Sequence, residues 1–100
     1  MSPLPPQLLE RLRSLESVRV VVAVADHAKR DVTFEPTTSV ATERWHVRAG
    51  GRDFELLLQG AKFYDTRAKK GGGGAVDLVM HLFGVGFMEA VGLLKRGGFE

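Results

Sequence analysis

Residues 71–98 read GGGGAVDLVMHLFGVGFMEAVGLLKRGG, and this stretch decides the fold. Apolar side chains recur at helical spacing over residues 76–83 and again over residues 87–94. Asp77 and Glu89 fall in the first turn of the two segments, where a carboxylate complements the helix dipole. The pattern therefore predicts two helices joined by a tight glycine turn.

The residues before the glycines have the alternating pattern of β-strands. Residues 45–48 and 54–58 predict the two strands of a hairpin, because residues 49–53 between them contain adjacent glycines. Residues 61–64 predict a further strand, and residues 32–35 predict a short one. We interpret the glycine run itself as a flexible or left-handed turn that lets the following helix pack closely.

The amino-terminal part predicts two more helices. Residues 1–6 are proline-rich and are expected to form an extended tail, while leucines at helical spacing predict a helix over residues 6–15. Residues 17–30 are ambiguous, because their valines favour a strand whereas Ser17 is a good N-cap. We interpret them as a helix, on the basis of an apolar stripe at helical spacing: Val20, Val21, Val24, Ala25 and Ala28.

Together these elements predict an α+β fold in a single domain over residues 1–100. A small antiparallel sheet is flanked by the amino-terminal helices and the carboxyl-terminal helical pair. A length of 100 residues with 44% hydrophobic content suffices for one core.

The longest apolar run, residues 20–25, is far shorter than the roughly 20 residues that span a bilayer. The sequence has no cysteine and no secretory signal, so we expect a cytoplasmic protein with no membrane partner.

The excess of positive charge lies in the middle of the chain. Residues 44–70 hold seven Lys or Arg against three Asp or Glu, although the net charge of the whole chain is only +2. Residues 62–70, KFYDTRAKK, interleave aromatic and basic side chains, as proteins that bind single-stranded nucleic acid do. The predicted DNA-binding residues are Arg44, Trp45, Arg48, Lys62, Tyr64, Arg67, Lys69 and Lys70. The alternative is that Trp45 and Phe63 are core residues and the cations a solvated loop.

Catalytic and metal motifs are missing from the sequence. The histidines, His27, His46 and His81, are too far apart in the chain to suggest converging metal ligands, so we expect no metal and no cofactor. The glycine run lacks the Lys-Ser or Lys-Thr of a phosphate-binding loop. We therefore expect a binding module and not an enzyme. A small enzyme that uses His81 with Asp77, one helical turn apart, is a further alternative.

Residues 62–65, KFYD, and residues 71–91 resemble the amino-terminal zinc-binding domain of bacterial DnaG-type primases. The resemblance is closer to cysteine-free relatives that precede Toprim domains in primase-like proteins of plasmids and mobile elements. It covers residues 44–96 well. Thr66 and Lys69 stand where that family has paired cysteines, so the resemblance implies a zinc-ribbon-like sheet without zinc.

The resemblance implies a single-stranded DNA-binding accessory module in the replication or transfer of a plasmid or mobile element. The catalytic acidic cluster of that family lies in its Toprim domain, so template binding is implied and priming is not. A primase, helicase or polymerase would be the expected protein partner. The alternative is a module that docks such a protein without contacting nucleic acid, through exposed apolar side chains of the terminal helices: Phe83, Val85, Phe87 and Met88.

Overall fold

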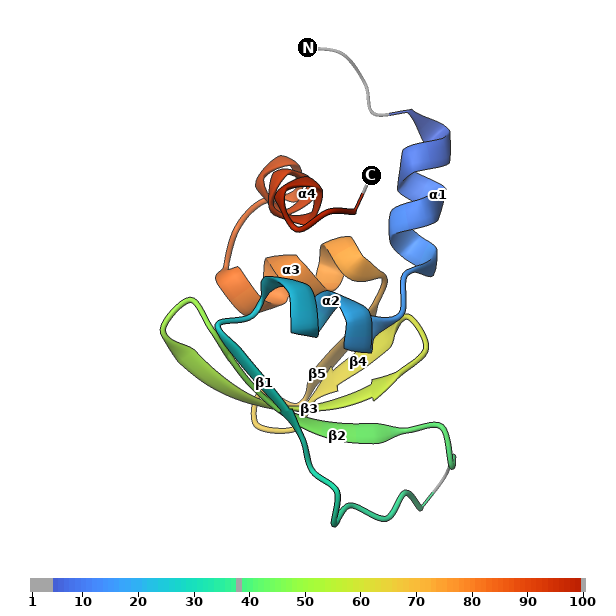
Figure 1. Cartoon of the computed structure of the whole chain (residues 1–100), viewed down its shortest axis with the longest axis vertical. Helices are drawn as coiled ribbons and strands as arrows, with labels where there is room; N and C mark the ends of the chain where they lie inside the picture. Colours follow the sequence, from blue (N-terminus) through green and yellow to red (C-terminus); the bar gives the residue numbers. More distant parts are fainter. Residues whose placement is uncertain (1–4, 38, 100) are drawn as a thin grey trace.

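The computed structural model describes residues 5–37 and 39–99, so part of the predicted tail, residues 1–4, lies outside the described residues. Within them, a five-stranded antiparallel sheet has helices on one face, which confirms the predicted α+β class (Figure 1). In chain order the elements are α1 (Pro6–Ser14), α2 (Ser17–Val24), β1 (His27–Arg30), β2 (Glu43–Ala49), β3 (Arg52–Gln59), β4 (Lys62–Asp65), β5 (Lys70–Gly73), α3 (Ala75–Phe83) and α4 (Phe87–Arg96).

The sheet is a simple meander in which each strand pairs with the next along the chain. The predicted hairpin is confirmed as β2 and β3, and its turn is only Gly50-Gly51. Both glycines have a positive φ, 57° and 78°, which a two-residue turn of this kind requires. This turn fixes the register of the hairpin, with Ala49 opposite Arg52 and Trp45 opposite Leu56.

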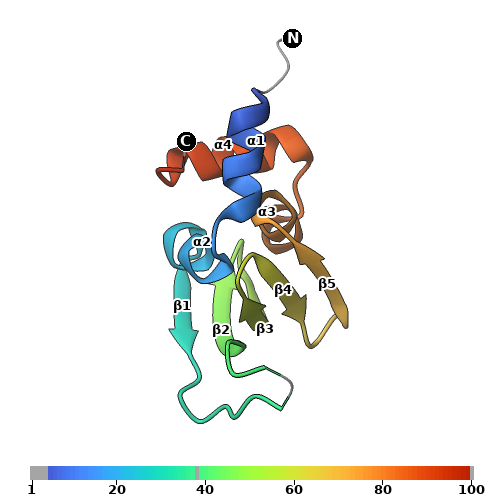
Figure 2. The same cartoon turned by 90° about the vertical axis from the view of Figure 1, so that its right-hand side faces the viewer.

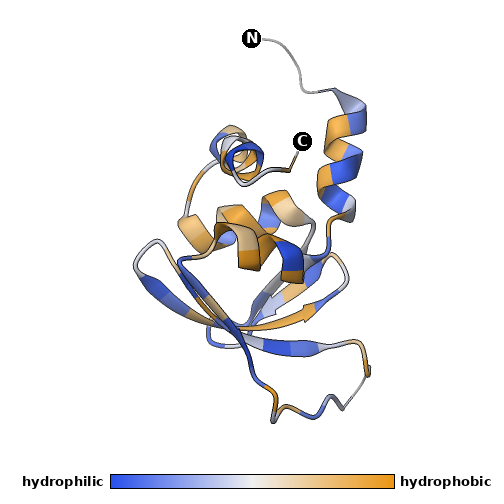
Figure 3. Cartoon of the chain, in the orientation of Figure 1, coloured by the Kyte–Doolittle hydropathy of each residue, from blue (hydrophilic) through white to orange (hydrophobic). Residues whose placement is uncertain are grey.

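The helices form two layers over the sheet, as two perpendicular views show (Figures 1 and 2). Helices α2 and α3 lie directly on the strands, and α1 and α4 lie farther from the sheet. Hydropathy follows this arrangement, because apolar residues dominate α2 and α3 (Figure 3). The predicted pair of carboxyl-terminal helices is thereby confirmed as α3 and α4.

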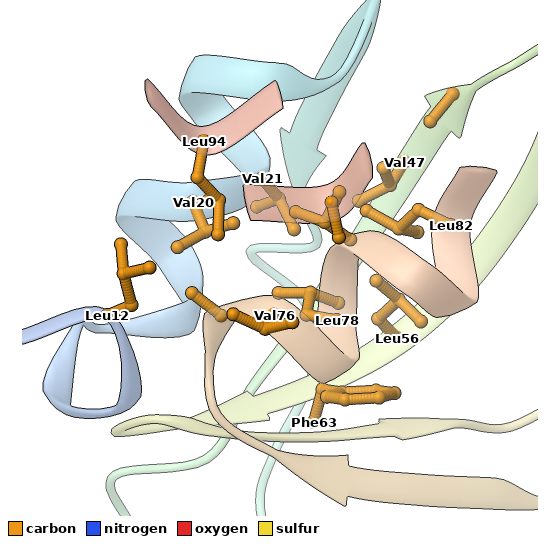
Figure 4. Packing of buried hydrophobic residues seen from close by; sticks show 14 of the residues in the cluster. Leu12, Val20, Val21, Val47, Leu56, Phe63, Val76, Leu78, Leu82 and Leu94 are labelled. Carbon is orange, nitrogen blue, oxygen red and sulfur yellow. The ribbon is translucent and has the colours of Figure 1, made fainter. Parts of the chain in front are cut away.

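The core fills the space between the sheet and the inner helices (Figure 4). Val47 and Leu56 from the strands meet Val21, Leu78 and Leu82 from the helices, and all five are fully buried. Burial of a side chain of this size stabilises the fold by about 1.5–3 kcal/mol. The core therefore holds the helices on one face of the sheet only.

Two predictions near the amino terminus need correction. The predicted helix over residues 17–30 ends at Val24, and His27–Arg30 instead form edge strand β1 against β2. The short strand predicted at residues 32–35 is a turn, because the Asp31 carboxylate accepts hydrogen bonds from the backbone N–H of Thr33 at 2.9 Å and from its hydroxyl at 2.6 Å.

The glycine run is also different from the predicted turn. Residues Lys70–Gly73 form strand β5 next to β4, and only Gly74 in the run has a positive φ, 94°. Gly72 is required by packing, since a Cβ there would lie 2.9 Å from Cε1 of the Phe63 ring. The glycines thus let an edge strand lie flat against an aromatic core residue.

Candidate nucleic-acid interface

The side of the sheet that faces away from the helices carries polar and basic side chains. Because Phe54, Leu56 and Leu58 of β3 point into the core, the side chains that alternate with them point to the other side. The strand register extends this alternation across the sheet. We call this side the open face, and its residues are His27, Lys29, Arg44, His46, Arg48, Asp53, Glu55, Leu57, Gln59, Lys62 and Tyr64.

Positive charge exceeds negative charge on the open face. Its fixed cations are Lys29, Arg44, Arg48 and Lys62, and Arg67 joins them from the β4–β5 turn, because its Nη2 lies 3.6 Å from Glu55 Oε1. The carboxylates are Asp53 and Glu55, together with Asp31, which follows β1 next to Arg44, so five cations face three carboxylates. Such a surface attracts a polyanion.

Three of these cations, Arg44, Arg48 and Arg67, are paired with Asp53 or Glu55. Arg44 Nε lies 3.5 Å from Glu55 Oε2, and Arg48 Nη1 donates to Asp53 Oδ2 at 3.0 Å. His46 lies between them, with Nδ1 2.8 Å from Glu55 Oε1. The Arg48–Asp53 pair is exposed, and such a pair contributes only about 0–1 kcal/mol, so Arg48 can exchange its carboxylate for a phosphate at low cost. Glu55 is less exposed and is shared by Arg44, His46 and Arg67.

Tyr64 places an aromatic ring on this charged surface. Its side chain is 42% exposed and lies opposite Leu57 of β3. Ring atom Cδ1 is 3.1 Å from where a Cβ of Gly71 would be, so the ring leans over the bare backbone of β5. An exposed ring held in this way can stack on a nucleic-acid base.

The eight predicted DNA-binding residues do not all lie on this surface. Arg44, Arg48, Lys62, Tyr64 and Arg67 are brought together on the open face or at its margin. Sequence reasoning missed His46, Leu57 and Gln59, which strict alternation along β2 and β3 would have revealed, and Lys29, whose strand β1 has no local pattern.

Trp45 lies on the helix side of the sheet, opposite Leu56, and packs against the core. Its Nε1 donates to Glu43 Oε1 at 3.0 Å. Phe63 is buried as well, as the alternative interpretation expected. Lys70 pairs with Asp65 in the strand register and so faces the helix side, while Lys69 lies in the turn with a φ of 55°. The predicted continuous surface thus loses Trp45 and Lys70.

The turn that carries Arg67 is fixed by Asp65, which is 3% exposed. Its Oδ1 accepts hydrogen bonds from the backbone N–H of Arg67 at 2.9 Å and of Ala68 at 3.0 Å. Its Oδ2 lies 2.7 Å from Nε2 of His81, and Thr66 Oγ1 donates to the carbonyl of Glu55 at 2.9 Å. Burial raises the pKa of Asp65, but the hydrogen bonds from Ala68, His81 and Arg67 outweigh it and leave the pKa below its ordinary value.

His81 contacts a different carboxylate from the one that the enzyme alternative requires. His81 is bonded to Asp65 and not to Asp77, so the proposed pair on one helix does not form. Thr66 and Lys69 do not suit zinc, since the first donates its hydroxyl to a carbonyl and the second is a cation. Within residues 5–37 and 39–99, no group of three or more His, Asp or Glu side chains could hold a metal ion.

In the part of the chain that the structure describes, no single helix is long and apolar enough to cross a membrane. Helices α3 and α4 meet that requirement only when counted together, and they are bent by 103° at the break between them. Five residues of α3 are moreover buried in the core.

Comparison with known proteins identifies one short similarity. Over 48 residues the chain is 46% identical to a "65 kDa protein" of Zymomonas mobilis subspecies mobilis, a match that covers 47% of this chain and 8% of that protein. The chain thus spans less than a tenth of the length of the relative that it matches. No family model matches the chain, and no solved structure matches it. The relative's name gives a mass and states no activity.

Proposed function

We propose that this chain is a single-stranded DNA-binding accessory module that acts in the cytoplasm, without enzymatic activity, in the replication or transfer of a plasmid or mobile element. The observation that supports binding is the open face, where cations of β1, β2 and β4 lie on the same side of the sheet as the exposed ring of Tyr64. The replication context rests on the resemblance of residues 44–96 to primase domains.

The shape of the open face favours a single strand over a duplex. Readout of duplex DNA needs an element that enters a groove, such as a helix or a protruding ribbon. Here the helices lie on the opposite side of the sheet, and four adjacent strands present a surface about 15 Å wide. The ring of Tyr64 can stack only on a base that is not already stacked on both sides.

Charge reversal on the open face tests this proposal. Lys29 and Lys62 are exposed, and no ion pair is found for either among the described residues. We expect Lys29→Glu with Lys62→Glu to weaken binding of a labelled oligo-dT of about 12 nucleotides by at least about tenfold at low salt, because two phosphate contacts are lost. Fluorescence anisotropy across a salt series measures the change.

The matched control is Lys95→Glu with Arg96→Glu, which makes the same charge change at the exposed end of α4. We expect a much smaller loss of affinity there. For the unaltered chain, the logarithm of the association constant should fall with the logarithm of the salt concentration at a slope of about −0.7 per neutralised phosphate. Equal losses in both double variants, or no binding at low salt, would contradict the proposal.

A second candidate function is docking of a protein partner. Phe87 is 43% exposed and Met88 is 47% exposed, both at the start of α4. Phe83 and Val85 are only partly exposed and pack against the core. The predicted apolar surface is therefore reduced to Phe87 and Met88. If docking is the function, Phe87→Ser with Met88→Ser abolishes capture of a partner from nuclease-treated lysate, and oligo-dT does not bind.

A further inference from the structure

A shallow pocket of about 300 Å³ lies on the open face beside Tyr64. Its open-face lining comes from two cross-strand pairs, Leu57 with Tyr64 and Gln59 with Lys62. Thr42, directly before β2, also lines it, as do Phe63 and Gly72 of the β4–β5 pair. Its volume is at the lower end of the range for small-molecule sites, about 300–1,000 Å³.

The pocket has one apolar wall and one polar wall. Leu57 is half-buried beside the ring of Tyr64, and together they offer an apolar surface to a flat ring system. Gln59 and Lys62, both exposed, form the polar side. An apolar surface with adjacent hydrogen-bond donors and a cation matches the base and phosphate of one nucleotide.

The hydrogen bond between Thr42 and Gln59 sets the chemistry of the polar wall. Thr42 Oγ1 donates to Gln59 Oε1 at 3.0 Å, so the amide oxygen already has a partner. The two N–H donors of the amide nitrogen have no acceptor among the described residues, which leaves them for a ligand. These donors suit a carbonyl oxygen of a base, whereas adenine offers them only ring nitrogens, of which N1 and N7 each lie beside its amino group.

We propose that this pocket binds one unstacked base that presents carbonyl oxygens, such as thymine, in preference to adenine, which presents none. The base stacks on Tyr64 against Leu57, the Gln59 amide donates to its carbonyl oxygen, and Lys62 contacts the adjoining phosphate. This inference rests on the proposed DNA binding and adds to it a site that recognises a base.

The test compares three labelled ligands of equal length, an oligo-dT, an oligo-dA and an abasic oligomer with the same phosphates. We expect oligo-dT to bind most tightly. Tyr64→Ala should weaken oligo-dT about 5- to 100-fold, the size of one lost stacking contact, and leave the abasic oligomer unchanged. Tyr64→Phe keeps the ring and should keep the affinity, which separates stacking from any loss of folding.

Gln59→Leu tests base selection within the same experiment. It removes the amide at similar size, so the preference for oligo-dT over oligo-dA should fall about three- to tenfold, the value of one hydrogen bond. Because self-stacking of oligo-dA is a property of the ligand, it cancels when the variant is compared with the unaltered chain.

The outcomes separate this inference from the proposed function. If all three oligomers bind equally and Tyr64→Ala changes nothing, the open face binds only phosphates, and the base site is refuted while DNA binding stands. If none of them binds at low salt, both proposals fail. Tighter binding of oligo-dA than of oligo-dT, unaffected by Gln59→Leu, also refutes the base site.

Discussion

Gly72 and Gly73 are neighbours in β5, but only Gly72 lacks room for a side chain. A Cβ on Gly72 would lie 2.9 Å and 3.0 Å from two atoms of the buried Phe63 ring, whereas a Cβ on Gly73 would meet nothing within 4 Å. Both residues belong to β5 and neither has a positive φ. The two neighbours therefore differ in packing alone.

We predict that Gly72→Ala lowers the free energy of unfolding by about 1–3 kcal/mol, because the Phe63 ring or the edge strand must move. Gly73→Ala is the matched control and should be neutral or stabilising by up to about 1 kcal/mol. Urea denaturation measures both. Equal effects of the two substitutions would show that β5 does not pack on Phe63 as described.

The stability of the fold depends on pH through Asp65. Its hydrogen bonds with Ala68, His81 and Arg67 outweigh burial and hold its pKa in the folded state below the unfolded value of about 3.9. Its contribution to stability is therefore fully present above about pH 4 and is lost as the pH falls through the lower, folded-state pKa. Asp31 has a lowered pKa as well, through its hydrogen bonds with Thr33.

We predict that Asp65→Asn lowers the free energy of unfolding at pH 7 by about 1–3 kcal/mol, because a buried acceptor of three hydrogen bonds is altered. The loss of stability between about pH 4 and pH 2 should be shallower in the variant. Chemical denaturation over this pH range measures it. An unchanged acid slope would rule out Asp65 as a source of the acid dependence.

Hydrophobic periodicity predicted an element correctly where buried side chains determine its structure. The predicted stripe holds within α2, because Val20 and Val21 are fully buried whereas Val22 is 59% exposed, but its members Ala25 and Ala28 lie beyond the helix. It failed at β1, whose sequence HAKR has no strand character of its own. This segment is a strand because its backbone completes the edge of β2, and a tertiary contact of that kind leaves no local pattern.

The α2 stripe gives a prediction at this scale. Val20→Ala should lower the free energy of unfolding by about 2 kcal/mol, through lost burial and the cavity left behind. Val22→Ala removes the same atoms from an exposed position and should change stability by less than about 0.5 kcal/mol. Thermal unfolding of the two variants measures the difference, and equal effects would contradict the orientation of α2.

The candidate site was only partly predictable from the sequence, because the face on which a side chain lies depends on how the strands pair. Clustered charge identified Arg44, Arg48 and Lys62, because charge is visible in the sequence. The face on which Trp45 lies depends on strand register. The Gly50-Gly51 turn sets that register, which pairs Trp45 with the buried Leu56. Alternation along β3 indicates the face of Gln59, but the sequence gives no signal that Thr42 is its partner, since only their hydrogen bond across the sheet makes them a pair.

At the scale of the whole molecule, the two faces of the sheet differ in what they carry. Both helical layers lie on one face of the sheet (Figures 1 and 2). The strand register places Tyr64 and the open-face cations on the other. The core and the proposed binding surface therefore share strands, and their side chains alternate along β2, β3 and β4. Substitutions on the open face should consequently change binding with little effect on folding, which makes the function testable by mutation.

The most direct test of the central claim is the side-chain NMR spectrum of the chain during titration with oligo-dT. We predict that the Leu57 methyl and Tyr64 ring signals shift and saturate, while those of the buried Leu82 and of the exposed Phe87 and Met88 stay in place. Shifts confined to Phe87 and Met88, or no shifts at low salt, would contradict binding at the open face.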